Sequence, residues 1–220
     1  MSEFKTRQEE FWAGEFGDEY TSRNRGVDWI ARNLALFEKI LARTDKVRTV
    51  IEFGANIGLN LQAIRQLLPD SELSAIEINR KAVGELQKLG YVKVYPRSIL
   101  EFSPDYPRDL SLVKGVLIHL NPDTLPKVYD LLHRSSNRYI CLAEYYNPSP
   151  VTITYRGHED KLFKRDFAGE MLDRFRDLRL IDYGFAYHRD PEFPQDDITW
   201  FLLEKNKNAN GQPGAGEKIK

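Results

Sequence analysis

The sequence has few of the features that mark secreted, membrane-spanning or metal-binding proteins. Its one cysteine, Cys141, can form no internal disulfide, and it lies in the apolar run Tyr139-Ile-Cys-Leu-Ala143, where a buried thiol is expected. No apolar run approaches the ~20 residues that a membrane span requires. The opening Met-Ser-Glu-Phe-Lys lacks the apolar stretch of a signal peptide. These absences predict a cytoplasmic protein with no membrane partner and no metal site.

An excess of charge of either sign is also missing. The chain has 32 basic and 33 acidic side chains, a formal net charge of -1, so it generates no broad positive field. Nucleic acid is therefore not expected as a partner. With 220 residues, 41% hydrophobic and 30% charged, the chain has the balance of a globular protein that can bury a substantial core.

Strand-like and helix-like patterns alternate along the chain, without internal repeats. Apolar residues at positions 27, 30, 34, 37 and 41 predict an amphipathic helix. Short apolar runs predict strands at 47–53, 73–78, 92–95, 110–118, 139–144, 178–187 and 197–204. Helices are expected after the first strand, after an Asn79 cap, after Asn121-Pro122 and at 166–175. Residues 145–165 are expected to form a long loop.

This alternation predicts an α/β fold with a doubly wound, mostly parallel seven-stranded sheet. No helix separates the last two strands, so the sheet is expected to end in an antiparallel hairpin. The tail from position 206 has no apolar periodicity and is expected to be disordered. We therefore expect an N-terminal helical segment at 1–45, the α/β domain at 46–205 and a tail at 206–220.

A glycine turn follows the first predicted strand, in Val50-Ile-Glu-Phe-Gly-Ala-Asn-Ile-Gly58. Gly54 permits a sharp turn, and Gly58 permits close packing of the next helix. Asn56 replaces the middle glycine of the dinucleotide fingerprint, so a side chain crowds the approach of a pyrophosphate. Glu52 repels a pyrophosphate but suits S-adenosylmethionine, which carries an ammonium and a sulfonium. Its alternative role is that of a partly buried carboxylate held by backbone N–H groups.

Two later strand ends complete this expected cofactor site. Glu77 ends the second strand, 23 positions after Gly54, where a carboxylate can accept both ribose hydroxyls. Ile78 follows it. After the third strand, Ile99 is expected to stack on the adenine ring, and Ser98 to bond its amino group.

These residues resemble the class I S-adenosylmethionine-dependent methyltransferases over about 47–205, and so imply a Rossmann-like fold. A closer resemblance, to the pseudaminic acid biosynthesis-associated methylases, covers nearly the whole chain except the tail. It rests on four segments: Phe11-Trp-Ala-Gly-Glu-Phe-Gly-Asp-Glu-Tyr20 with Arg23-Asn24, Lys114-Gly-Val-Leu-Ile-His-Leu-Asn-Pro-Asp123, Ala143-Glu-Tyr-Tyr-Asn-Pro148, and Tyr155-Arg-Gly-His158 through Leu162-Phe-Lys-Arg-Asp-Phe-Ala-Gly-Glu-Met171. The resemblance implies that a nine-carbon sugar acid, or its nucleotide-activated form, is modified for surface or flagellin glycans. Lys114, which opens the second segment, is expected at the cofactor.

The expected acceptor site lies beyond the fourth and fifth strands. His119 is expected to end the fourth strand and act as a base, or else to be fixed by the helix start at Asn121-Pro122. Glu144 is the second candidate base. Arg156 offers a fork for a carboxylate or phosphate of an anionic small molecule. The remaining expected substrate contacts are Tyr145, Tyr146, Tyr155 and His158.

The N-terminal aromatic residues permit two interpretations. Trp12, Phe16 and Tyr20 recur at about one helical turn, which fits either simple packing or a lid that closes over the sulfonium. We expect a helical lid, with Trp12 and Tyr20 at the cofactor and Arg23 paired with its methionyl carboxylate.

The expected function is therefore methyl transfer to a nitrogen or oxygen of a small polar acceptor. A neutral nitrogen needs little more than alignment, whereas a hydroxyl needs a base. The alternatives are an NAD-dependent dehydrogenase or epimerase of sugar metabolism, and a non-catalytic cofactor-binding scaffold.

Overall fold

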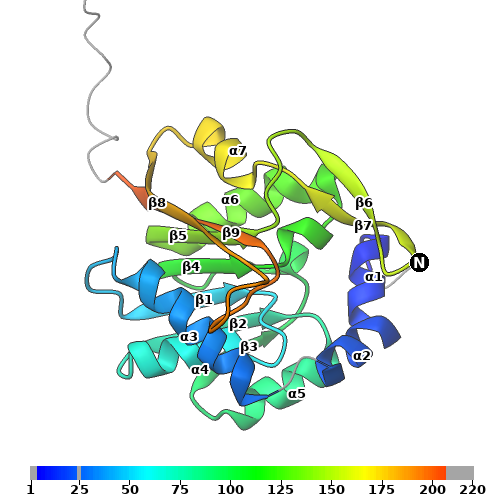
Figure 1. Cartoon of the computed structure of the whole chain (residues 1–220), viewed down its shortest axis with the longest axis horizontal. Helices are drawn as coiled ribbons and strands as arrows, with labels where there is room; N and C mark the ends of the chain where they lie inside the picture. Colours follow the sequence, from blue (N-terminus) through cyan, green and yellow to red (C-terminus); the bar gives the residue numbers. More distant parts are fainter. Residues whose placement is uncertain (1–3, 24–25, 207–220) are drawn as a thin grey trace, which may run out of the picture.

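The computed structural model describes residues 4–23 and 26–206. Its centre is a seven-stranded sheet with helices on both faces (Figure 1). The strand order is β3-β2-β1-β4-β5-β9-β8, in which β9 alone runs in the direction opposite to the other six strands. The strands are β1 (Thr49–Phe53), β2 (Glu72–Glu77), β3 (Val92–Pro96), β4 (Arg108–Lys114), β5 (Ser136–Glu144), β8 (Leu178–Ala186) and β9 (Ile198–Lys205). The predicted sheet and its terminal hairpin are confirmed.

Two groups of helices cover the sheet because its inner strands are apolar on both faces. On one face lie α3 (Val27–Leu41), α4 (Leu59–Leu67) and α5 (Arg80–Lys88); on the other lie α6 (Leu125–Ser135) and α7 (Phe167–Arg174). In β1, Val50 packs with the first group, whereas Ile51 and Phe53 pack with the second. Helix α3 has the bounds that its apolar spacing predicts, and Asn79 caps α5 as expected.

The predicted long loop at 145–165 is wrong, because most of it forms a two-stranded hairpin, β6 (Val151–Tyr155) and β7 (His158–Lys164). Figure 1 shows this hairpin beside α1 (Arg7–Ala13), which is followed by α2 (Glu15–Arg23). Gln8 Nε2 donates to Asp160 O (3.0 Å), and Lys161 Nζ donates to Arg7 O (3.3 Å). We call α1, α2 and the β6–β7 hairpin the cap.

The fourth strand is shorter than predicted. It ends at Lys114; Gly115 then adopts a φ of +65°, and a 3₁₀ helix, η2 (Leu117–His119), follows. Two more 3₁₀ helices are η1 (Ile99–Glu101) and η3 (Pro122–Thr124). Because the chain turns at Gly115, His119 lies in η2 and not at the strand end.

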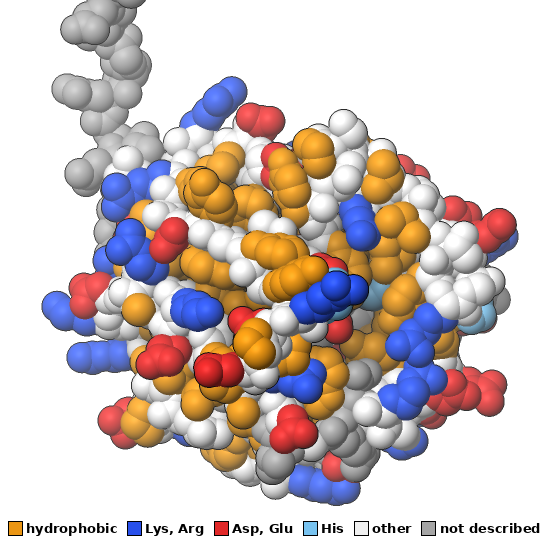
Figure 2. All heavy atoms as spheres, viewed as in Figure 1, with side chains coloured by type: hydrophobic (Ala, Val, Ile, Leu, Met, Phe, Trp, Pro, Cys, Tyr) orange, Lys and Arg blue, Asp and Glu red, His pale blue; other side chains and the backbone are white. Residues whose placement is uncertain are grey.

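Aromatic side chains lie exposed at the β8 edge of the sheet. Figure 2 shows hydrophobic side chains gathered over β8 and β9 on this face. Tyr183 is 64% exposed and Phe185 59%, and the ring of Tyr183 stacks on Phe201 at 6.2 Å. Within the described residues, no helix combines the length and apolar character needed to cross a membrane. The predicted disordered tail falls, from position 207 on, outside the described part of the chain.

Candidate functional site

A cavity of about 560 Å³ lies at the carboxyl ends of β1, β2 and β4, between the sheet and the cap. Such strand ends are where open α/β sheets bind ligands. Of the residues predicted to bind cofactor, those lining it are Trp12, Tyr20, Gly54, Asn56, Glu77, Ile78, Ser98, Ile99 and Lys114. Of those predicted at the acceptor, the lining residues are His119, Tyr145, Tyr155 and Arg156.

The glycine turn has the backbone geometry that its sequence suggests. Gly54 has a φ of +72°, and a Cβ there would lie 2.7 Å from Val116 Cγ2. Asn56 is left-handed (φ +47°), and its N–H donates to Glu77 Oε2 (2.7 Å). Gly58 does not line the cavity. A Cβ on Gly58 would lie 2.7 Å from Leu86 Cδ2, so this glycine permits the packing of α4 on α5.

Backbone N–H groups hold Glu77 at the cavity wall. Asn56 N donates to its Oε2, and Asn79 N donates to its Oε1 (2.8 Å). Burial raises the pKa of this carboxyl, whereas the bonds from Asn79 and Asn56 act in the opposite direction. Each oxygen retains a lone-pair direction for a ligand. Glu77 can therefore accept two hydroxyl groups without moving.

Glu52 is placed differently from its prediction. The alternation of β1 turns its side chain toward α4, where Asn60 Nδ2 donates to its Oε1 (2.5 Å). Glu52 is fully buried, does not line the cavity, and has a pKa raised to about 8 by burial. The partner of Oε1 is thus a side-chain amide and not a backbone N–H group. Asn60 does line the cavity, and Lys114, whose charge acts on Glu52, lines it too.

Three buried polar atoms on lining residues have no hydrogen-bond partner among the described residues. They are Trp12 Nε1, a donor, and two acceptors, Gln8 Oε1 and Asn60 Oδ1. A buried polar group without a partner costs about 1–3 kcal/mol. A ligand with both donors and acceptors offsets this cost, so the cavity fits a polar ligand that spans from α1 to α4.

Ser98 is already bonded on both sides. Its hydroxyl donates to Glu9 Oε1 of α1 and accepts from Leu100 N (2.9 Å). Glu9 lines the cavity and also forms the capping box of α1 with Thr6. Recognition of an adenine edge here would therefore involve Glu9 as well as Ser98.

His119 is held as a neutral imidazole that faces the cavity. Its Nδ1 lies 2.6 Å from Lys161 O of β7, and since a carbonyl only accepts, Nδ1 carries the proton. Nε2 then has a free lone pair. Burial lowers the pKa of His119 to about 4, so the ring is neutral at pH 7. Trp12 and Tyr155 flank it, with ring centroids at 4.7 and 5.0 Å.

Four other predicted residues lie outside the cavity lining. Glu144 accepts the backbone N–H groups of Val116, Leu117 and Ile118, at the start of η2, at 3.0, 3.0 and 3.4 Å. Its carboxylate therefore holds this turn and does not line the cavity. Tyr146 is 41% exposed near Phe201. The ring of His158 lies 4.9 Å from Phe11 inside the cap. Arg23 pairs with Glu19 at 3.2 Å on the surface and does not line the cavity.

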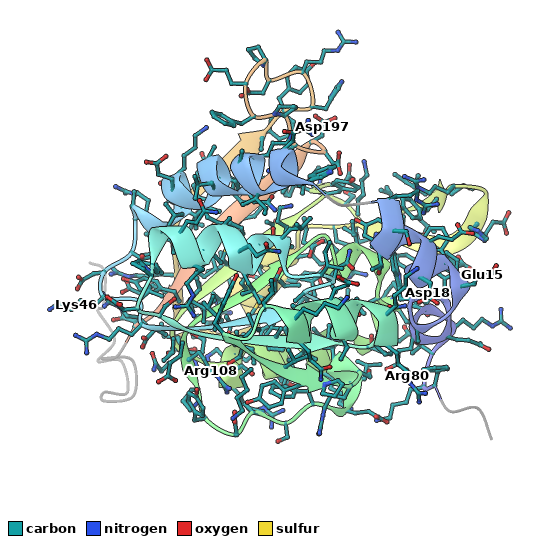
Figure 3. The ribbon with its side chains drawn as sticks, turned by 90° about the horizontal axis from the view of Figure 1, so that it is seen from below. Glu15, Asp18, Lys46, Arg80, Arg108 and Asp197 are labelled. Carbon is teal, nitrogen blue, oxygen red and sulfur yellow. The ribbon has the colours of Figure 1, made fainter. Side chains whose placement is uncertain are left out.

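The end of the cavity where the predicted acceptor residues lie also includes residues that the sequence did not reveal. They come from α3 and from the loop between β8 and β9: Trp29, Asn33, His188, Asp196 and Asp197. Figure 3 shows Asp197 in this loop, near the first turns of α3. Isolated residues of these types carry no sequence signal, because only the fold brings α3 and the β8–β9 loop to the site.

Hydrogen bonds join the cap to the loops of the cofactor-side wall. Thr21 Oγ1 of α2 donates to Asn56 Oδ1 (3.1 Å). Asn79 caps α5 through its Oδ1 and donates from Nδ2 to Asp18 Oδ1 (2.8 Å). Figure 3 shows Asp18 of α2 on the side of the molecule where α5 begins at Arg80. The Glu9–Ser98 bond is a third link, and Asn79 Nδ2 also donates to Trp12 O of α1 (3.3 Å).

Comparisons with known proteins give a fold assignment. No family model matches the sequence, and no curated protein matches it. Solved structures do match. The Burkholderia thailandensis 1,6-didemethyltoxoflavin-N1-methyltransferase, bound to 1,6-didemethyltoxoflavin and S-adenosylhomocysteine, has a TM-score of 0.64 at 14% identity, over 91% of this chain and 87% of its own.

Two further structures agree with this match. The plantazolicin methyltransferase BpumL with S-adenosylhomocysteine has a TM-score of 0.64 at 15% identity, over 91% of this chain and 94% of its own. The Synechocystis PCC 6803 magnesium protoporphyrin IX methyltransferase with bound S-adenosylmethionine has a TM-score of 0.62 at 12% identity, over 93% and 100%. The chain has the fold of these methyltransferases. Their acceptors differ widely, so the shared fold does not identify an acceptor.

Proposed function

We propose that the chain is an S-adenosylmethionine-dependent methyltransferase that acts on a small polar acceptor. The observation that carries the proposal is the geometry of Glu77, whose two oxygens are fixed at the cavity by Asn56 N and Asn79 N. A carboxylate fixed in this way can accept both hydroxyls of a ribose. The fold of the solved methyltransferases supports the same proposal.

The remaining lining residues fit the other parts of this cofactor. Ile78 and Ile99, both partly buried, offer apolar faces for an adenine ring. Asn60 Oδ1 offers an acceptor for the methionyl ammonium, and Trp12 Nε1 offers a donor. The cofactor would supply a methyl group on a sulfonium, which aromatic faces attract by about 0.5–2 kcal/mol each. Trp12 and Tyr20, edge-to-face at 5.2 Å, provide such faces.

His119 is proposed to orient the acceptor. Its Nε2 lone pair accepts a hydrogen bond from an N–H or O–H, and Lys161 O keeps the ring in this tautomer. With a pKa of about 4, the imidazole is a weak base. An alcohol would gain little from it, whereas a neutral amine or amide-type nitrogen needs alignment more than deprotonation. We therefore propose nitrogen as the methylated atom.

The acceptor is proposed to be a nonulosonic, pseudaminic-type sugar acid or its nucleotide-activated form. This proposal rests on the resemblance of the sequence to the pseudaminic acid-associated methylases and on Arg156 at the cavity rim. A guanidinium binds carboxylates and phosphates in a bidentate manner. Tyr145 and Tyr155 line the same end and offer hydroxyl groups to a sugar.

The N-terminal segment 1–45 is proposed to act as a lid over the cofactor-binding domain of residues 46–205, whose β6–β7 hairpin completes the cap. Helices α1 and α2 reach the cofactor-side loops through Glu9, Asp18 and Thr21. The hairpin reaches His119 through Lys161 O. Closure would thus complete both ends of the cavity and exclude water from the reaction.

Calorimetric titration with S-adenosylmethionine, S-adenosylhomocysteine and NAD tests the cofactor. We expect binding of the first two and none of NAD; binding of NAD alone would instead support a dehydrogenase or epimerase. Incubation of the protein with methyl-labelled S-adenosylmethionine and nonulosonic acids, followed by mass spectrometry, tests the acceptor. Binding of the cofactor without transfer to any metabolite would indicate a scaffold.

A further inference from the structure

Two side chains of opposite charge lie at the acceptor end of the cavity without pairing with each other. Arg156 and Asp196 both line this cavity. Neither forms an ion pair or a side-chain hydrogen bond with any residue that the structure describes. A single exposed charge is satisfied by water, but two unpaired opposite charges on one cavity are a pattern that a ligand can use.

The position of Arg156 is determined by the turn of the cap hairpin. It lies between β6 and β7 with a left-handed φ of +49°, followed by Gly157 at +84°. Its guanidinium lies 5.7 Å from the ring centroid of Tyr155, which also lines the cavity. This contact leaves the donors of the guanidinium available to an anionic group.

The position of Asp196 is determined by its neighbour. Gln195 is buried, and its Nε2 donates to Asn33 Oδ1 of α3 (3.2 Å), which anchors the β8–β9 loop on that helix. Asp196 is exposed next to this anchor. Its carboxylate is therefore held at the cavity rim while both of its oxygens remain available.

Tyr20 lies within the electrostatic reach of both groups. The pKa of Tyr20 is raised to about 12, first by burial and then by the charges of Tyr155 and Asp196, whereas Arg156 acts to lower it. The two charges thus act on one phenol from different elements, and they are farther apart than an ion pair allows. Trp29 and Tyr145 line the same end of the cavity and offer aromatic faces to a cation.

We propose that the methyl acceptor carries a positive and a negative group, with the anionic group bound by Arg156 and the cationic group by Asp196. This inference rests on the proposed methyltransferase function and narrows its substrate class to amino acids, amino sugar acids and similar zwitterions. The ammonium at Asp196 is a recognition group, because a protonated nitrogen has no lone pair for methyl transfer. The nucleophile is a separate atom of the acceptor, near His119.

The test uses the full chain saturated with S-adenosylhomocysteine and a set of linear probes. The probes are straight-chain amino acids of three to eight carbons with a terminal amine and a terminal carboxylate, together with the amine and the acid of each length. Ligand-observed NMR titrations give their relative affinities. The variants are Arg156→Gln and Asp196→Asn, with Arg176→Gln and Asp173→Asn as controls, since both control residues are exposed and lie outside the cavity.

We expect at least one amino acid to bind about fivefold or more tightly than the amine and the acid of its length. Each rim variant should remove this preference: Arg156→Gln should equalise amino acid and amine, and Asp196→Asn should equalise amino acid and acid. The control variants should keep it. Equal binding of acids and amino acids, equal binding of amines and amino acids, or no binding of any probe would overturn the inference. Titration of the parent protein with S-adenosylmethionine tests the proposed function separately.

Discussion

Replacement of Glu77 by alanine should affect both folding and cofactor binding, and the structure allows these effects to be separated. Glu77 accepts two backbone N–H groups, from Asn56 and Asn79, at 2.7 and 2.8 Å. Leaving them without an acceptor costs about 1–3 kcal/mol each. The variant also loses two charge-assisted bonds to a ribose, at roughly 1.5–3 kcal/mol each. We therefore expect a loss of about 100-fold or more in affinity for S-adenosylhomocysteine.

Asp109 provides the matched control. It also accepts two backbone N–H groups, from Arg48 and Thr49, at 2.8 and 3.1 Å, but it lies at the opposite ends of β1 and β4. Asp109→Ala should lower the free energy of unfolding in urea while leaving the calorimetric Kd within about twofold of the parent, a change of under ~0.5 kcal/mol.

Glu77→Gln retains one acceptor oxygen and should fall between the parent and Glu77→Ala in both measurements. The reasoning is refuted if Glu77→Ala, still folded at the temperature of titration, binds S-adenosylhomocysteine as tightly as Asp109→Ala does. Glu77 would then hold the backbone and nothing else.

Three further predictions concern the cap and the buried titratable groups. Deletion of residues 1–24 should abolish methyl transfer while the α/β domain stays folded. In the full chain, cofactor binding should quench tryptophan fluorescence, and Trp12→Phe should remove this quenched signal. Turnover by the truncated protein at the rate of the parent would disprove the lid. His119 has a folded pKa of about 4, below its unfolded value. The stability that its neutral form gives the folded protein is therefore present above pH 6.5 and lost as the pH falls toward 4. At pH 5 the parent should have lost roughly 2 kcal/mol of its free energy of unfolding through His119, and His119→Gln should lack this loss; urea unfolding measures both. Glu52 has a folded pKa of about 8, above its unfolded value, so stability falls as the pH rises from about 4.5 to 8. Glu52→Gln should therefore be more stable than the parent at pH 8 by a few kcal/mol and gain nothing at pH 4.5; an equal effect at both pH values would contradict the buried carboxyl.

The sequence predicted most of the sheet because each strand is a short apolar run between turn residues. It did not predict the β6–β7 hairpin, whose strands are mostly exposed, with Leu162 and Phe163 of β7 as the buried exceptions. A signal was present nonetheless: Val151-Thr-Ile-Thr-Tyr155 is rich in β-branched residues, and Arg156-Gly157 is a turn.

The sequence predicted site residues better where their place depends on the course of the backbone than where it depends on the direction of a side chain. Gly54 and Asn56 both have a positive φ in the turn after the strand, a conformation that glycine and asparagine adopt more readily than other residues. Glu52 was expected to face the ligand, but the strand alternation turns it toward Asn60. Glu144 was a candidate base because it ends a strand, but its carboxylate accepts hydrogen bonds from a turn, η2, that the sequence does not predict.

Three of the hydrogen bonds between the cap and the loops at the cavity wall have a consequence for the speed of turnover. Under the proposed function, the bonds Thr21–Asn56, Asp18–Asn79 and Glu9–Ser98 would have to separate before the spent nucleoside leaves. At about 0.5–1.5 kcal/mol each, they slow the exit by roughly 10- to 1,000-fold relative to an open groove. Under the proposed function, exchange of the spent nucleoside is expected to be slower than the first methyl transfer. The time course of methyl transfer should therefore begin with a burst of one product per active site, and dilution of the spent nucleoside should restore the steady rate only slowly.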